Sequence, residues 1–144
     1  MIQLSIRRAA FFAALLLAAS AAFGADSREE ISREVHKTLP LKAGQRLDVD
    51  HQNGDVRLRG VPGGELKVDA RIRVSSSDMD EAKKFADSIA IDIASTASGA
   101  MVKTRYPEGK SFFGSRRVSY SVDYDISVPE GAAVSVRNKF GDVT

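Results

Sequence analysis

The chain contains no cysteine, and its only two histidines, His36 and His51, lie in separate segments. Without cysteine there is no disulfide framework, and no residue can carry the lipid anchor of a lipoprotein. Zinc sites need three or four converging ligands, so neither histidine indicates a metal site. We therefore expect a fold held together by packing and backbone hydrogen bonds, with no metal or other cofactor.

The chain also lacks an apolar run long enough to span a bilayer. Its longest run, residues 9–22, follows Arg7 and Arg8 and is followed by Phe23-Gly24. A charged start, a short apolar run and small residues at the cleavage positions are typical of a secretory signal peptide. We predict a signal peptide over residues 1–24 and export to the periplasm or cell surface; an uncleaved membrane anchor is the alternative.

An excess of one charge is missing as well. The predicted signal peptide holds two of the 21 basic residues and no acidic one, so 19 basic residues face 19 acidic ones in the remainder. A neutral chain has no general electrostatic attraction for nucleic acid, so we expect no nucleic-acid partner.

In the remainder of the chain, apolar and polar residues often alternate, which predicts strands with one buried and one solvated face. The clearest cases are residues 66–74 and 118–128. Between them, apolar residues at spacings of three and four after Asp78 predict one amphipathic helix over 79–88, which caps the β structure. Residues 25–38 are polar and charged, with Ile31 and Val35 at helical spacing, and we read them as a frayed helix or disordered leader. The predicted domain therefore covers residues 39–144.

Two segments of this domain share one pattern. The first Gly-Asp segment (residues 47–60) has Leu47 and Val49, a turn at Asn53-Gly54-Asp55, then further aliphatic residues, and reads as a β-hairpin. The second Gly-Asp segment (residues 134–144) matches it through Gly141 and Asp142, at a constant offset of 87 positions. We assign a structural role in turns to Asn53, Gly54, Asp55, Gly141 and Asp142. The alternative is that two unrelated hairpins share a common turn signature.

These features resemble the family of bacterial envelope proteins named putative adhesin. The resemblance rests on the signal peptide, the Asn-Gly-Asp-Val and Phe-Gly-Asp-Val sequences and the helix that begins at Met79, and it covers residues 41–144. It implies an exported, mainly β domain, either an antiparallel or solenoid-like β stack or a β-sandwich with one capping helix. It also implies that further Gly-Asp-Val sequences follow, so that this chain is an N-terminal fragment truncated at its C-terminus.

No catalytic pattern emerges from the polar residues. The acidic cluster Asp48, Asp50 and Asp55 fails the calcium-loop spacing, because the sixth position from Asp48 is asparagine and the twelfth is arginine. His51 falls on the inward side of its strand at the turn, where we expect it to cap the turn. There is no serine-nucleophile motif and no phosphate-binding glycine loop before a helix. We therefore predict a protein that is not an enzyme.

Two basic regions are candidate contact surfaces. Phe112 and Phe113, flanked by Arg116 and Arg117, form a possible contact with a partner or the membrane surface; the alternative is that the phenylalanines fold back onto the core. The second region is a set of basic residues that alternation places on one outward sheet face, where a solvated surface is the alternative: Arg57, Arg59, Lys67, Arg71 and Arg73.

The sequence therefore favours an exported, non-catalytic β-scaffold or interaction module of the cell envelope, adhesin-like, whose partner is an unidentified envelope component or surface ligand. Two alternatives are a ligand-binding module for anionic polymer or lipid headgroups, and a carboxylate-based glycan hydrolase. The hydrolase would require a pair of carboxylates that converge in a cleft.

Overall fold

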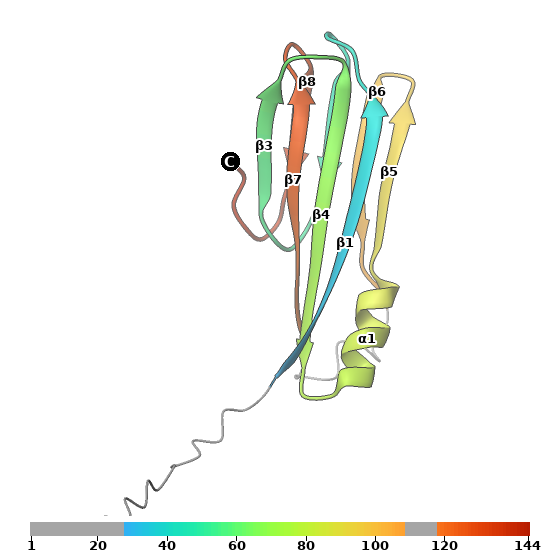
Figure 1. Cartoon of the computed structure of the whole chain (residues 1–144), viewed down its shortest axis with the longest axis vertical. Helices are drawn as coiled ribbons and strands as arrows, with labels where there is room; N and C mark the ends of the chain where they lie inside the picture. Colours follow the sequence, from blue (N-terminus) through green and yellow to red (C-terminus); the bar gives the residue numbers. More distant parts are fainter. Residues whose placement is uncertain (1–27, 109–117) are drawn as a thin grey trace, which may run out of the picture.

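Two four-stranded β-sheets face each other in the computed structural model, which describes residues 28–108 and 118–144 (Figure 1). The first sheet has the order β1-β4-β7-β3, with bounds Glu29–Pro40, Glu65–Ser76, Ser119–Pro129 and Val56–Val61. The second has the order β5-β6-β2-β8, with bounds Ala90–Thr96, Gly99–Arg105, Arg46–Asp50 and Ala133–Arg137. The prediction of a mainly β fold with one helix is confirmed, and of the architectures considered the two facing sheets correspond to the sandwich.

The core lies between the sheets and follows from the alternation in the sequence. Strand β4 buries every second residue from Leu66 onward, and β7 buries every second residue from Val122 onward. The opposite sheet contributes Leu47 and Val49 from β2 and Val102 from β6, and all belong to one apolar cluster. Each such side chain, once fully buried, contributes about 1.5–3 kcal/mol to folding.

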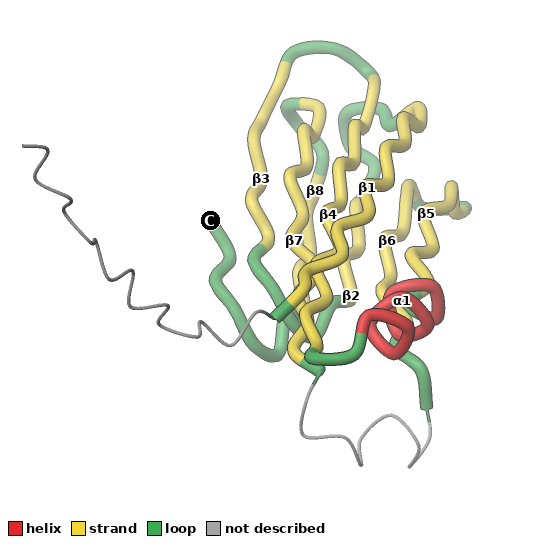
Figure 2. The backbone as a smooth tube through the Cα atoms, turned by 60° about the horizontal axis from the view of Figure 1, so that its bottom comes forward, coloured by secondary structure: helices red, strands yellow, loops and turns green. Residues whose placement is uncertain are grey.

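Helix α1, Met79–Ser88, lies at one end of the two sheets (Figure 2). The carboxylate of Asp78 caps it by accepting hydrogen bonds from the N–H groups of Asp80 and Glu81. The helix packs against β4 and β1 and buries Ala82, Phe85 and Ala86. The predicted helix and its capping position are therefore confirmed.

The prediction of a polar leader over 25–38 is wrong from Glu29 onward. These residues form most of β1, which pairs antiparallel with β4 along its whole length. The strand lies at the edge of its sheet, so its inward side chains are only partly buried, and one of them is Arg33. A charged residue at an inward position interrupts the apolar alternation, which explains why the sequence looked like a leader. The predicted signal peptide, 1–24, lies outside the described residues.

The predicted hairpin in the first Gly-Asp segment is also wrong. Strands β2 and β3 belong to opposite sheets, so Asn53-Gly54-Asp55 carries the chain across the sandwich instead of reversing it within one sheet. The second Gly-Asp segment lies directly beside the first in parallel register. Leu47 pairs with Val134, and Val56 forms an isolated parallel bridge with Val143, so the 87-residue offset of the sequence is also the offset of the pairing.

Candidate functional site

The glycines of the two Gly-Asp segments allow three stretches of backbone to approach closely. Gly54 has φ +129°, and a Cβ there would lie 2.0 Å from the carbonyl oxygen of Val122. Gly141 has φ +117°, and a Cβ there would lie 2.1 Å from the carbonyl oxygen of Gly54. Any other residue would meet both unfavourable φ and a backbone clash. Glycine is therefore required for this stacking.

The aspartates link the same three layers through their side chains. The N–H of Asp55 donates to Asp123 Oδ1 at 3.0 Å, and the N–H of Asp142 donates to Asp55 Oδ1 at 3.1 Å. Asparagine side chains add to this, because Asn53 Nδ2 donates to the carbonyl of Tyr120 and Asn138 Nδ2 to that of Gly54. We call this arrangement the Gly-Asp stack. It brings together all five residues to which the sequence assigned a structural role.

The last layer of the stack is uncovered by the described residues. We define the open side as β8 together with residues 138–144. Val134 and Val143 are 42% and 48% exposed, although the residues beside them in the first segment, Leu47 and Val56, are each 0% exposed. Phe140 is 59% exposed, with Lys139 Nζ 5.3 Å from its ring centre. Val134 and Val143 thus lie at positions that are core positions one layer deeper, whereas Phe140 lies beside Asn53.

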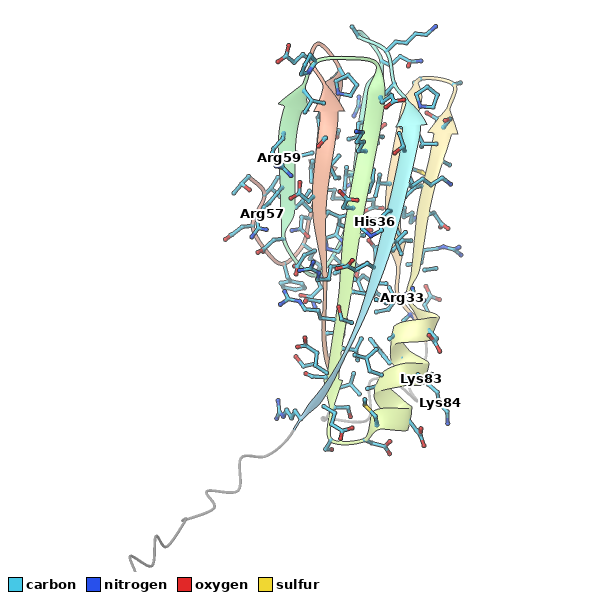
Figure 3. All side chains as sticks on the ribbon, viewed as in Figure 1. Arg33, His36, Arg57, Arg59, Lys83 and Lys84 are labelled. Carbon is cyan, nitrogen blue, oxygen red and sulfur yellow. The ribbon has the colours of Figure 1, made fainter. Side chains whose placement is uncertain are left out.

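The opposite side of the sandwich is closed. There β1 contacts β5, and the guanidinium Nη2 of Arg33 donates to the carbonyl oxygen of Ile89 at 2.7 Å. Ile89 is the C-cap of α1, so Arg33 supplies a cation where the last turn of the helix has no basic residue. Figure 3 shows Arg33 close to the helix. We call this arrangement of β1, β5 and α1 the closed side.

The outward side chains of β1, β4, β7 and β3 form a charged face (Figure 3). All five basic residues predicted to share a face lie on it, but acidic residues of β1 and β7 are interleaved with them. The ion pairs are Arg71 with Glu34 at 2.8 Å, Arg59 with Asp125 at 2.5 Å and Arg73 with Asp123. These exposed pairs each contribute no more than about 1 kcal/mol. The face therefore presents both signs of charge and no basic field for an anionic polymer.

A hollow of about 490 Å³ lies on the charged face, lined by the carboxylates Glu34, Asp55, Asp69, Asp123 and Asp125. Each of these accepts a hydrogen bond or ion pair from an arginine, a histidine or a backbone N–H. His36 Nδ1 lies 2.6 Å from Asp69 Oδ1, and this hydrogen bond raises the pKa of His36 above its usual value. His36 therefore belongs to β1 and the charged face, and not to a leader.

His51 is a core residue, and its predicted turn-capping role stays a prediction. It is 1% exposed, its Nδ1 lies 2.9 Å from the Thr104 hydroxyl, and its ring meets that of Tyr124 edge to face. The Thr104 hydroxyl lies 2.6 Å from that of Tyr124, which completes a buried polar chain. Burial lowers the pKa of His51 and raises that of Tyr124 to about 12. His51 is therefore held neutral inside the sandwich at physiological pH.

The remaining expectations from the sequence concern the Phe112–Arg117 contact, metal binding and membrane spans. Phe112, Phe113, Arg116 and Arg117 lie outside the described residues, so their contact role stays a prediction. Within 28–108 and 118–144, no group of three or more histidine or acidic side chains is arranged to hold a metal ion. No helix in that part of the chain is long and apolar enough to cross a membrane.

Comparison with known proteins gives matches at the level of solved structures. No family model and no curated protein matches this chain. A putative cell adhesion protein from Clostridium sporogenes is 14% identical, with a TM-score of 0.43 over 78% of this chain and 50% of that one. A putative adhesin from Bacteroides fragilis is 14% identical, with a TM-score of 0.34 over 77% and 42%.

A third match is a putative adhesin from Parabacteroides distasonis, 6% identical, with a TM-score of 0.32 over 76% of this chain and 37% of that one. The chain therefore spans half or less of the length of the structures that it matches. All three are bacterial proteins named for adhesion.

Proposed function

We propose that this protein is an exported, non-catalytic, adhesin-like interaction module of the bacterial cell envelope, which engages its partner through the open side. The observation that carries this proposal is the half-exposed apolar set Val134, Phe140 and Val143 on the outermost layer of the Gly-Asp stack. Contiguous exposed apolar side chains on a folded domain mark contact surfaces. Export is supported by the signal-peptide pattern of residues 1–24.

The charged face supports a non-catalytic role. A glycan hydrolase needs two carboxyl groups that flank a scissile bond and act as acid and base or nucleophile. In the hollow, by contrast, the carboxylates are engaged by Arg59, Arg71, Arg73, His36 and backbone N–H groups. These contacts join β1, β4, β7 and β3 across the sheet, which is a structural use of the acids.

Co-sedimentation with bacterial cell-envelope fragments tests the proposal. We expect the purified full chain to bind in a saturable way, and the double variant Val134→Lys, Val143→Lys to lower the bound fraction at least tenfold. The matched control is Arg57→Gln, Arg59→Gln on the charged face, which should bind like the unaltered chain. Melting temperatures within a few degrees of one another show that all three proteins are folded.

Two outcomes would contradict the proposal. Binding that the charged-face variant abolishes and the open-side variant leaves intact would move the contact to the charged face. Recovery of the chain from cells only in the cytoplasmic fraction, with Met1 retained, would remove the envelope assignment. Variants of Phe112, Phe113, Arg116 and Arg117 in vesicle co-sedimentation test the second contact that the sequence predicts.

A further inference from the structure

We propose that Asn53 is a latent deamidation site, which the Gly-Asp stack keeps unreactive in the folded domain and whose modification in an opened chain prevents the stack from forming again. The chain has two asparagines, Asn53 and Asn138, and only Asn53 is followed by glycine. Glycine has no Cβ to shield its backbone nitrogen, and it is conformationally free in an unfolded chain. Asn-Gly is therefore the sequence in which an asparagine side chain reacts most readily with the backbone.

The reaction needs no reagent other than water. The backbone nitrogen of Gly54 attacks Cγ of Asn53, the Cγ–Nδ2 bond breaks, and the side-chain amide leaves as ammonia with the proton of the Gly54 nitrogen. The product is a cyclic imide, which water opens at either carbonyl carbon to give aspartate or isoaspartate. In isoaspartate the main chain runs through Cβ and Cγ, so that it is longer by one methylene group.

Hydrogen bonds hold both ends of the reacting peptide unit in the folded domain. Its carbonyl, on Asn53, accepts from the N–H of Val122 at 2.9 Å and from the Tyr106 hydroxyl at 3.3 Å. Its N–H, on Gly54, donates to the carbonyl of Phe140 at 3.0 Å. The nitrogen of the imide carries no proton, so ring closure would remove the hydrogen bond to Phe140 and leave that carbonyl without its donor.

The leaving amide is held as well. Nδ2 of Asn53 donates to the carbonyl of Tyr120 at 2.7 Å, and this bond is lost when ammonia leaves. The backbone of Gly54 packs so closely against β7 that a Cβ there would lie 2.0 Å from the carbonyl oxygen of Val122. In the stack, Gly54 thus loses the conformational freedom that makes Asn-Gly reactive.

The rate of modification is therefore set by opening of the stack. When only the opened chain reacts, the rate in the folded protein is the rate of the unfolded chain multiplied by the fraction that is open. Deamidation of Asn53 then records how often the contacts of Gly54 with Val122 and Phe140 are broken.

Both products fit the stack poorly. Aspartate at position 53 places a negatively charged acceptor where the amide donated to the Tyr120 carbonyl. Isoaspartate also lengthens the main chain directly before Gly54, whose contact with the Val122 carbonyl leaves no space for an added atom. A chain that carries isoaspartate at position 53 therefore cannot restore the stack.

The test compares deamidation of the full chain in buffer and in urea above the unfolding midpoint, at the same mildly alkaline pH, by peptide mapping with mass spectrometry. Asn53 should react at least about tenfold more slowly in buffer than in urea. In urea, Asn138 should react more slowly than Asn53, because the side chain of Lys139 shields the next nitrogen. Equal rates at Asn53 in buffer and urea would overturn the protection, and faster reaction at Asn138 in urea would overturn the choice of site.

Two variants locate the protection within the stack. Gly141→Ala places a Cβ 2.1 Å from the carbonyl oxygen of Gly54, so it should displace the second Gly-Asp segment and raise the rate at Asn53 in buffer. Gly63→Ala is the matched control, since no atom lies within 4 Å of its Cβ position, and it should leave the rate unchanged. Unchanged rates in both variants would overturn the role assigned to the contact with Phe140.

Refolding tests the effect of the modification. After urea is removed, size-exclusion chromatography separates refolded from unfolded chains, and peptide mapping should find isoaspartate at position 53 only in the unfolded fraction. Asn53→Asp separates loss of the amide from lengthening of the main chain: it should refold, with a lower urea midpoint than the unaltered chain. Isoaspartate in the refolded fraction would overturn the claim that modification prevents the stack from forming again.

Discussion

The closed and open sides end the same two sheets in different ways. On the closed side, β1 carries Arg33 at an inward position and contacts β5, and α1 covers the end of the sheets. On the open side, inward positions hold Val134 and Val143, which are 42% and 48% exposed. Inward charges and covering helices are devices by which proteins protect sheet edges from pairing with other chains. Among the described residues, such devices lie on the closed side only.

The comparison also separates two kinds of polar contact. On the charged face, exposed ion pairs join strands and contribute little energy individually. In the Gly-Asp stack, the carboxylates of Asp123 and Asp55 receive backbone N–H groups, and the geometry allows only glycine before Asp55 and Asp142. The stack therefore determines which backbone segments lie next to one another. The charged face, by contrast, supplies the charged surface of the domain.

The largest expected effect comes from adding a side chain at Gly54, where two layers of backbone are in contact. Gly54→Ala should destabilise the domain by at least about 3 kcal/mol or prevent folding, because the new Cβ meets the Val122 carbonyl. Gly63 is the control, since its φ is also positive at +116° but no atom lies within 4 Å of its Cβ position. Gly63→Ala should cost only about 1–2 kcal/mol. Equal losses in urea unfolding would show that the close approach has no energetic role.

A second pair of variants compares equivalent positions of the two segments. Leu47→Ala should cost about 2–5 kcal/mol because the side chain is fully buried. Val134→Ala, one layer outward, should cost less than about 1 kcal/mol because its side chain is already 42% exposed. Denaturant midpoints measure both. A large loss for Val134→Ala would mean that the open side is covered in solution.

The closed side is tested by Arg33→Met, which retains most of the packing and removes the donor to the Ile89 carbonyl. We expect a loss of about 1–3 kcal/mol, since a carbonyl at the end of α1 is left without its partner. Arg59→Met is the control on the charged face, where an exposed ion pair to Asp125 should be worth about 0.5 kcal/mol. If both variants have equal stability, Arg33 does not secure the closed side.

The smallest expected effect is on the pH dependence of the free energy of unfolding. Because the pKa of folded His51 lies below its unfolded value of 6.5, the unfolded state takes up its proton first, and stability falls as pH drops below 6.5. His36 acts in the opposite sense, since its folded pKa is raised: its contribution is full below 6.5 and is lost as pH rises through the folded value. Urea unfolding between pH 8 and 5.5 measures both effects. On acidification, the free energy of unfolding should fall less in His51→Asn than in the unaltered chain, and more in His36→Gln.

How much of this could be predicted depends on which interactions are local. The helix 79–88 is specified by its own spacing and by Asp78, so the sequence was sufficient. The alternation in β4 and β7 likewise identified strands, because one face of each is fully buried. For β1, the inward Arg33 interrupts that pattern, and its guanidinium donates to the carbonyl of Ile89, which is distant in the sequence.

The geometry of the candidate site depends on pairing between distant segments. Aliphatic residues point inward whether Asn53-Gly54-Asp55 reverses the chain or carries it across to the opposite sheet, so the sequence did not distinguish a hairpin from a crossing. The constant offset of 87 between the two Gly-Asp segments did signal that they are equivalent, and the structure places them side by side at that offset. The acids of β7 reach the charged face only through pairing with β4.

Amide hydrogen exchange of the free protein, followed by NMR, tests the contrast between the two sides most directly. The N–H groups of Val134 and Val136, which point away from β2, should exchange at least 100-fold faster than those of β4 and β7 in the middle of their sheet. Slow exchange at Val134 and Val136, equal to that of β4, would contradict the account, because it would show that the open side is already paired.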